Sequence, residues 1–150
     1  LQSLESITTY TEHHLAAWSQ PCRSLRERWT NAPYAEWNID PMWLDIPFQL
    51  MILWSLQQRQ EPCLPVGFSR LYRTQSYNPH MHERFYVHLK TQPANRALLR
   101  ADAYVYHHTG EPILWIEGIQ CVSDASLFEA FQARSLSSEF ILHPALNTQK

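Results

Sequence analysis

The chain has 150 residues, a net charge of −2, a hydrophobic fraction of 45% and six tryptophans, which is enough apolar material for one buried core and excludes intrinsic disorder. Its three glycines are isolated from one another, so no segment can form the glycine-rich turn of a dinucleotide site or a P-loop. The near-neutral charge provides no field for nucleic acid or an anionic membrane, and we expect neither as a partner.

The first predicted element lies at residues 5–18, where Ile, Thr and Tyr favour a strand while the Leu-Ala-Ala-Trp run favours a helix equally. Residues 1–38 together form a poorly defined lead-in, because residues 23–38 are interrupted by Pro33 and predict irregular structure. His13 and His14 fall in this lead-in. One of two neighbouring residues in a strand faces inward by geometry alone, so either histidine could face the helix as a base.

Residues 42–59 predict a helix that is apolar on nearly every side, as expected of a helix at the centre of a fold. Its start can be read in two ways. With Asp40 as N-cap and Pro41 at the first position, Pro47 falls in the second turn and costs about 3 kcal/mol. With Asp45 as N-cap, Pro47 falls in the first turn, where no N–H is needed. We expect the helix to start at Asp45.

Four strand-like runs follow the helix, at residues 65–77, 84–91, 97–108 and 112–123. Gly110 lies in the short turn between the last two, which predicts an antiparallel hairpin. Apolar residues alternate with polar ones from Leu99 to Val105, as a half-buried strand requires. A short helix at residues 125–134 and a tail end the chain. An apolar helix followed by a long antiparallel sheet predicts an α+β fold with the sheet wrapped on the helix.

Asp45 and Gln49 are the candidate catalytic residues, because positions i and i+4 share one helix face. Asp45 stands among apolar neighbours. Burial disfavours the charged form of a carboxyl, and a carboxyl that stays protonated near neutral pH can act as a general acid. The positive end of the helix dipole opposes this by up to about 1 kcal/mol. A plain structural interpretation, with Asp45 as N-cap and Gln49 as a spacer, stays open.

A rival hypothesis is a metal site at His80, His82 and Glu83, since an HxH pair followed by a carboxylate is similar to the ligand triad of cupins. The fit is poor, because Glu83 adjoins His82 where the cupin pattern leaves a gap. Solvated loop histidines are the preferred interpretation. His107 and His108 stand beside the hairpin turn and are expected on its exposed surface. We therefore expect no metal site.

The cysteines and the apolar runs indicate in which cellular compartment the protein works. Cys22, Cys63 and Cys121 form no CxxC pair and lie far apart in the sequence, which argues against a disulfide framework or a thiolate metal site. We therefore expect a reducing, cytoplasmic environment. The longest mainly apolar run, residues 46–56, is too short to span a bilayer, and no signal-peptide pattern opens the chain. We expect one domain over residues 1–150 and no membrane segment.

Three segments carry a family resemblance: IDPMWLDIPFQ at residues 39–49, CLPVGFSRL at 63–71, and the hairpin from LRAD to IEGI within 99–119. In this order they resemble the "HPxLLDxxxQ" helix, the "LPVxIxRL" strand and the terminal hairpin of dehydratase domains in polyketide synthases and polyunsaturated-fatty-acid synthases. The motif region, residues 39–123, is similar to the second, C-terminal half of that domain, with residues 124–150 beyond it. The resemblance implies a hot-dog fold, in which a long antiparallel sheet wraps one central helix, and the family domain contains two such units.

The same resemblance implies a reaction that removes water from a β-hydroxyacyl chain carried on an acyl carrier protein. A histidine of the first half takes the α-proton, and by motif match Asp45 would assist departure of the hydroxyl while Gln49 hydrogen-bonds the acid or the hydroxyl. The residues that would line the acyl tunnel are Pro41, Leu44, Phe48, Leu64 and Pro65. No cofactor is implied beyond the phosphopantetheine arm of the carrier protein.

The chain also departs from the family pattern. No histidine is followed by the family's HxxxGxxxxP pattern, and Asp40 replaces the histidine before the helix proline. We therefore expect a unit that takes the catalytic histidine from a second hot-dog half or a homodimer partner. The alternative is a catalytically silent pseudo-dehydratase that serves as a structural or dimerisation module. A single hot dog leaves a sheet edge open, so a second half or a second copy is expected to pair there.

Overall fold

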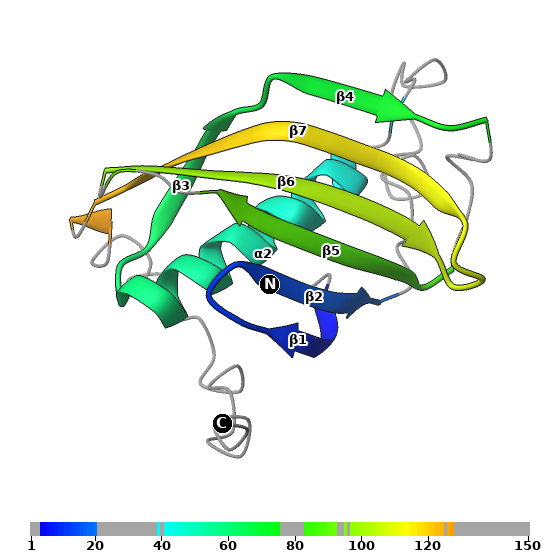
Figure 1. Ribbon diagram of the computed structural model, residues 1–150, viewed down its shortest axis with the longest axis horizontal. Coiled ribbons are helices and arrows are strands. Elements are labelled where there is room, and N and C mark those ends of the chain that lie inside the picture. Colours follow the sequence, from blue (N-terminus) through cyan, green and yellow to red (C-terminus); the bar gives the residue numbers. More distant parts are fainter. Residues whose placement is uncertain are drawn as a thin grey trace, which may run out of the picture.

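The computed structural model describes residues 4–20, 39, 41–75, 83–92, 95, 97–124 and 126–127. In this part of the chain one long helix lies against one antiparallel sheet (Figure 1). The elements are β1 Leu4–Tyr10, β2 His14–Ser19, α2 Pro41–Arg59, β3 Cys63–Gly67, β4 Arg70–Arg73, β5 Phe85–Gln92, β6 Leu98–His107 and β7 Pro112–Ser123. The strand order is β1-β2-β5-β6-β7-β3, and β4 also pairs with β7. The predicted α+β architecture, a sheet wrapped on a central helix, is confirmed.

The predicted hairpin between the last two strands is present as β6 and β7. Gly110 closes its turn with φ 89°, a left-handed conformation that glycine adopts without a Cβ penalty. Along β6, Leu99, Ala101, Ala103 and Val105 are buried while the residues between them are not, as predicted. The alternation therefore determines which face of this strand lies on the helix.

The ambiguous N-terminal segment forms a hairpin of β1 and β2. β2 lies between β1 and β5, with Leu15 opposite Leu89 and Ala17 opposite Val87. The Leu-Ala-Ala-Trp run is helix-compatible by itself, but pairing with β5 satisfies its backbone groups and buries its small side chains. Tertiary pairing therefore overrides local propensity here.

The helix begins at Pro41, so the expectation that it starts at Asp45 is wrong. Pro47 lies inside the helix and cannot donate an N–H to the carbonyl of Trp43, a cost of about 3 kcal/mol. The first turns are held by packing: Trp43 and Ile46 are both almost fully buried, and the Trp43 ring lies 3.8 Å from the Phe85 ring between centroids. Burying each large apolar side chain contributes roughly 1.5–3 kcal/mol, which offsets the missing bond.

The single strand predicted at residues 65–77 is divided into β3 and β4, with a break at residues 68–69. Both pieces pair with β7, on either side of Gly118. Gly118 has φ 64°, and the β6–β7 register shifts opposite it, as in a β-bulge that bends a strand. The neighbouring strand breaks where β7 bends. The helix predicted at residues 125–134 and the irregular segment at 23–38 lie largely or wholly outside the described residues.

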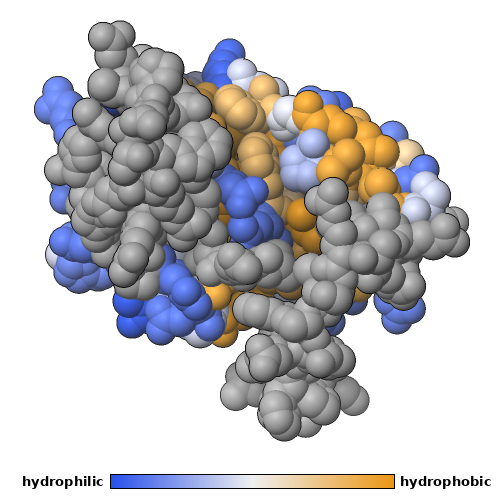
Figure 2. Space-filling view, turned by 180° about the vertical axis from the view of Figure 1, so that it is seen from behind, coloured by the Kyte–Doolittle hydropathy of each residue, from blue (hydrophilic) through white to orange (hydrophobic). Residues whose placement is uncertain are grey.

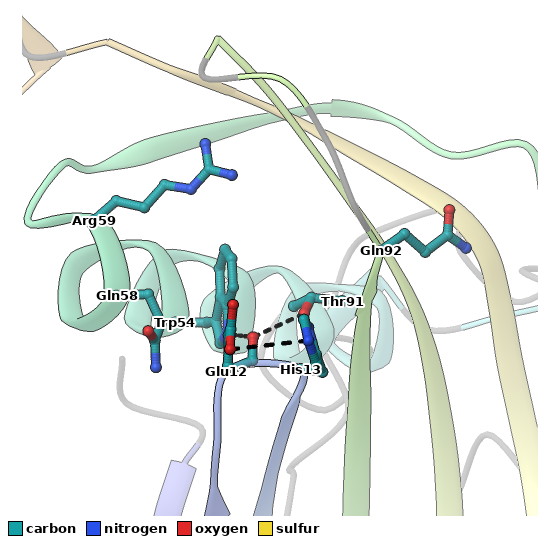
Figure 3. A pocket seen from close by; sticks show the side chains of 7 residues that line it. All are labelled: Glu12, His13, Trp54, Gln58, Arg59, Thr91 and Gln92. Carbon is teal, nitrogen blue, oxygen red and sulfur yellow. Dashed lines mark hydrogen bonds and ion pairs between the residues drawn. The ribbon is translucent and has the colours of Figure 1, made fainter.

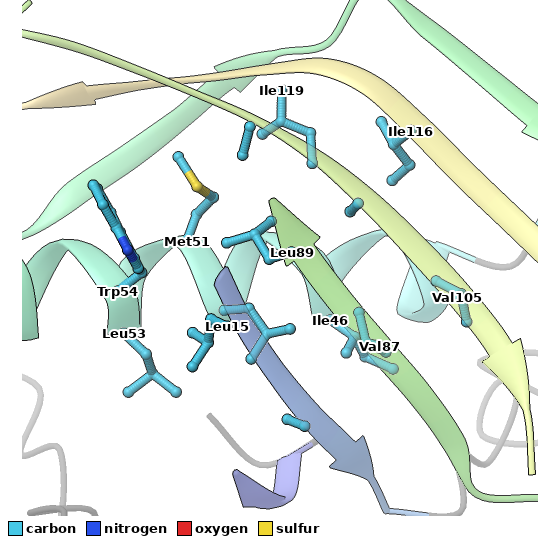
Figure 4. Close-up of a cluster of buried hydrophobic side chains, with 14 of the residues drawn as sticks. Leu15, Ile46, Met51, Leu53, Trp54, Val87, Leu89, Val105, Ile116 and Ile119 are labelled. Carbon is cyan, nitrogen blue, oxygen red and sulfur yellow. The ribbon is translucent and has the colours of Figure 1, made fainter. Parts of the chain in front are cut away.

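The hydrophobic core fills the space between α2 and the inner face of the sheet (Figure 4). Leu50 and Met51 of the helix meet Leu89 of β5 and Ile119 of β7 there, and all four are fully buried. The opposite helix face is also mostly apolar and half-buried, as Phe48 illustrates. In the described part of the chain no helix has the length and hydrophobicity to cross a membrane.

Candidate functional site

Asp45 and Gln49 are neighbours on α2, as predicted. The amide nitrogen Nε2 of Gln49 donates a hydrogen bond of 2.5 Å to Oδ2 of Asp45. The sequence left the burial of Asp45 open, and the structure shows its side chain exposed. With the helix starting at Pro41, Asp45 lies about 200° around the axis from Trp43, which faces the sheet. The carboxylate therefore points away from its own sheet.

The residues expected to line an acyl tunnel lie on two elements. Pro41 is exposed at the start of α2, while Leu44 and Phe48 are half-buried along the helix. Leu64 is exposed on β3, and Pro65 beside it is half-buried. Since Leu64 and Pro41 are open to solvent, the described residues do not by themselves enclose a tunnel.

A cavity of about 320 Å³ lies at the other end of the helix (Figure 3). Its walls come from the β1–β2 turn, the last turns of α2 and the end of β5, and its lining residues are Glu12, His13, Trp54, Gln58, Arg59, Thr91 and Gln92. Hydrogen bonds fix the turn: Trp54 Nε1–H donates to the Glu12 carbonyl at 3.1 Å, and the Thr91 N–H donates to the His13 carbonyl at 2.9 Å. The sequence pattern did not reveal this cavity, because its walls meet only through strand register.

The cavity is remote from Asp45. Trp54 is nine residues further along α2, which corresponds to about 13 Å of helix, so His13 does not meet the candidate acid. His13 Nε2 lies 4.0 Å from the Glu12 carboxylate with both side chains mostly exposed, a pair that contributes little energy. The volume stands at the low end of the range of about 300–1,000 Å³ for ligand pockets. The cavity provides an imidazole, a carboxylate and a guanidinium, but not the predicted catalytic pair.

His14 does not face the helix. It lies on the outer face of the sheet, where its Nδ1 is 3.0 Å from Nε2 of His88 and the two rings stack at 5.1 Å. Burial, and then the neighbouring His14 and Lys90, lower the pKa of His88. Because one imidazole must accept the proton that the other donates, this contact favours at least one neutral ring. The pair is a structural contact of β2 with β5.

Glu83 meets two histidines that the sequence interpretation did not assign to it. His107 Nε2 and the Glu83 carboxylate form a very short contact, and His108 Nδ1 lies 2.9 Å from the same oxygen, Oε2. The side chain of His107 is only 14% exposed, so its expected place on the exposed hairpin surface is wrong, whereas His108 is 52% exposed, as expected. The predicted partners His80 and His82 lie outside the described residues.

Cys63 and Cys121 also come together, although they are distant in the sequence. Cys63 on β3 and Cys121 on β7 are both free and buried, and the Cys63 thiol donates to the Met51 carbonyl at 3.5 Å. Contact with Cys63, followed by burial, raises the pKa of Cys121. The pair is therefore a thiol contact inside the core, and the antiparallel pairing of β3 with β7 is what creates it.

The model of one protein family, PS-DH, described as the polyketide synthase dehydratase N-terminal domain, matches residues 1–127. A search of curated proteins gave no match. Among solved structures, the chain is similar to the dehydratase domain from the CurJ module of curacin polyketide synthase, with a TM-score of 0.60, 14% identity, and coverage of 83% of this chain and 43% of that chain.

Two further solved structures are not dehydratases by name. The fluoroacetyl-CoA thioesterase FlK matches with a TM-score of 0.62, 9% identity and coverage of 87% of this chain and 98% of that chain. A Streptococcus mutans UA159 protein bound to acetyl CoA matches with a TM-score of 0.59, 8% identity and coverage of 79% and 87%. At these identities the similarity shows the fold, and the predicted hot-dog fold is confirmed.

The predicted relation to polyketide synthase dehydratases is confirmed, but the assignment to the C-terminal half is not, because the matching family is that of the N-terminal domain. The chain spans less than half of the curacin dehydratase domain. A relation to polyunsaturated-fatty-acid synthases stays a prediction.

Proposed function

Because the chain belongs to the polyketide synthase dehydratase N-terminal domain family, we propose that it is one hot-dog unit of a dehydratase-type domain. Its substrates would be β-hydroxyacyl chains delivered on the phosphopantetheine arm of an acyl carrier protein, with no other cofactor. The family match over residues 1–127 carries this proposal. The coverage of 43% of the curacin dehydratase domain fits one of two such units.

In the proposed reaction a base removes the α-proton and an acid protonates the departing β-hydroxyl. Asp45 is the proposed acid, and its hydrogen bond from Gln49 holds the carboxylate in place. An acid at neutral pH needs a site with little water, since burial is what favours the protonated form. Asp45 is exposed, so a second surface must cover it, and the proposed acyl tunnel would form between that surface and Leu44 and Phe48.

The edge of the sheet supports a second hot-dog half or a second copy as this covering surface. Among the described strands, β3 pairs with β7 alone. It presents Leu64 and Val66 to solvent, with Val66 57% exposed, and Phe68 directly after the strand is also exposed. Hydrophobic side chains also lie open on the side of the molecule seen in Figure 2. An exposed apolar edge strand is a template for pairing with another chain. The same partner would supply the missing catalytic histidine.

The test uses the full chain with β-hydroxyacyl and enoyl thioesters of pantetheine, following dehydration and the reverse hydration. Asp45→Asn is compared with wild type and with the control Asp124→Asn. Asp124 is an exposed aspartate that directly follows the end of β7. Turnover that Asp45→Asn abolishes and Asp124→Asn keeps supports the proposal. Thioester binding without turnover, weakened only by Asp45→Asn, supports an incomplete half. Turnover unchanged in Asp45→Asn removes Asp45 from the mechanism.

A silent structural module is the second candidate. It is favoured by the placement of the described histidines, since His13 lines a remote cavity and His14 and His88 contact each other on the outer face. This function predicts neither turnover nor thioester binding, together with association through β3. Binding of a β-hydroxyacyl thioester that depends on Asp45 would contradict it.

A further inference from the structure

The cluster of Glu83, His107 and His108 has the donors of a metal site. One ligand atom from each residue lies within 4.8 Å of the other two, and His108 Nδ1 is 2.9 Å from Oε2 of Glu83. A tetrahedral zinc ion with bonds of about 2.0–2.1 Å separates its ligand atoms by roughly 3.3 Å. Small side-chain movements would therefore let all three atoms reach one ion. Neither the family match nor the proposed dehydration uses this cluster.

The backbone holds the cluster in place. Phe85 of β5 pairs with His107 of β6, so Glu83, two residues before Phe85, is carried to the end of β6. The hairpin turn is closed around His107, whose N–H donates to the Glu111 carbonyl and whose carbonyl accepts from the Gly110 N–H, both at 2.8 Å. The two histidines on this fixed hairpin lose less conformational entropy on binding an ion than ligands on a loose loop would.

The ring of His107 is also oriented by a neighbour. Oγ1 of Thr109 lies 2.8 Å from Nδ1 of His107, while Nε2 of the same ring points to Glu83. A metal-bound histidine needs an acceptor for its other ring N–H. In the tautomer with the proton on Nδ1, the Thr109 hydroxyl accepts it at 2.8 Å and Nε2 is free for the ion; the Thr109 N–H makes only a longer contact of 3.4 Å with Nδ1. This is the outer-sphere support that metal-binding histidines have in proteins.

The donor set selects the ion. Two imidazoles and one carboxylate are a zinc ligand set that leaves a fourth position open for water, whereas magnesium and calcium prefer oxygen donors alone. We propose that Glu83, His107 and His108 form a binding site for one zinc ion per chain. The site lies where β5 begins and β6 ends, at the end of the sheet near Trp43 of α2.

Zinc titration of the chelator-treated full chain against a chromophoric competitor tests this, with cobalt absorption as a second readout for coordination by nitrogen and oxygen. We expect one zinc per chain. Glu83→Gln and His107→Ala should weaken binding beyond the roughly 10- to 100-fold expected for losing an outer-sphere partner, and Thr109→Val should weaken it within that range. Glu83→Gln is isosteric at a half-exposed residue, so loss of folding would not mimic its effect.

His13→Ala is the matched control, because His13 is an exposed histidine outside the cluster, and it should bind zinc like wild type. His80→Ala distinguishes the proposed site at Glu83, His107 and His108 from the HxH motif at His80 and His82. Binding lost in His80→Ala and kept in His107→Ala would place the metal at the motif and overturn the proposal. Absence of stoichiometric binding, or equal weakening by His13→Ala and His107→Ala, would also overturn it.

Discussion

Replacing Gly118 with alanine should destabilise the sheet at its bend. Gly118 has φ 64°, and an added Cβ would lie 2.5 Å from Oγ and 3.0 Å from Cβ of Ser69. The left-handed backbone costs an alanine about 1–2 kcal/mol, and forcing atoms into an occupied space adds about 1–3 kcal/mol. Rotation of the Ser69 hydroxyl relieves part of the overlap. We therefore expect Gly118→Ala to lower the free energy of unfolding by about 2–4 kcal/mol.

The other two glycines separate the backbone contribution to this loss of stability from the steric contribution. Gly110 has φ +89° and nothing within 4 Å of an added Cβ, so Gly110→Ala should lose only the backbone part, about 1 kcal/mol. Gly67 has open space and an ordinary φ, so Gly67→Ala should be neutral or gain roughly 0.4–1 kcal/mol. Urea denaturation of each variant measures the differences.

A double-mutant cycle with Ser69→Gly isolates the overlap. If Ser69 is the obstacle, Ser69→Gly should recover about 1–2 kcal/mol in the Gly118→Ala background relative to its effect in wild type. Two results would refute the reasoning: Gly118→Ala as stable as wild type, or a loss equal to that of Gly110→Ala with no coupling to Ser69. Either would mean that β7 does not bend at this glycine against Ser69.

Three further substitutions test other features. Burial, with His14 beside it, lowers the pKa of His88 in the folded chain. Because the unfolded chain then binds the proton more readily, the free energy of unfolding should fall as pH drops below about 6.5. His88→Gln should reduce this pH dependence in denaturation curves. Pro47→Ala restores a bond to the Trp43 carbonyl but removes buried ring carbons, and a net gain of up to about 1 kcal/mol is expected; a loss of that size would contradict it. Val66→Lys should leave the melting temperature unchanged but reduce association in sedimentation.

The candidate site was only partly predictable. The i, i+4 spacing of Asp45 and Gln49 correctly placed them in contact, because helical periodicity is local. Whether Asp45 is buried or exposed could not be predicted from this spacing, since it depends on which face of the helix meets the sheet. The helix starts at Pro41, Trp43 packs against Phe85 on the sheet side, and Asp45 faces outward in this arrangement. A sequence pattern contains the period of a helix, but not its rotation against a distant strand.

Local sequence patterns were sufficient to predict the apolar central helix, the alternation along β6 and the hairpin at Gly110, because each depends on residues that are close in sequence. Contacts that join distant strands required the folded structure. Glu83 meets His107 because β5 and β6 pair with Phe85 opposite His107, and Cys63 meets Cys121 because β3 pairs with β7. A shift of one residue in either register would send these side chains to the other face of the sheet, and no short motif records that register.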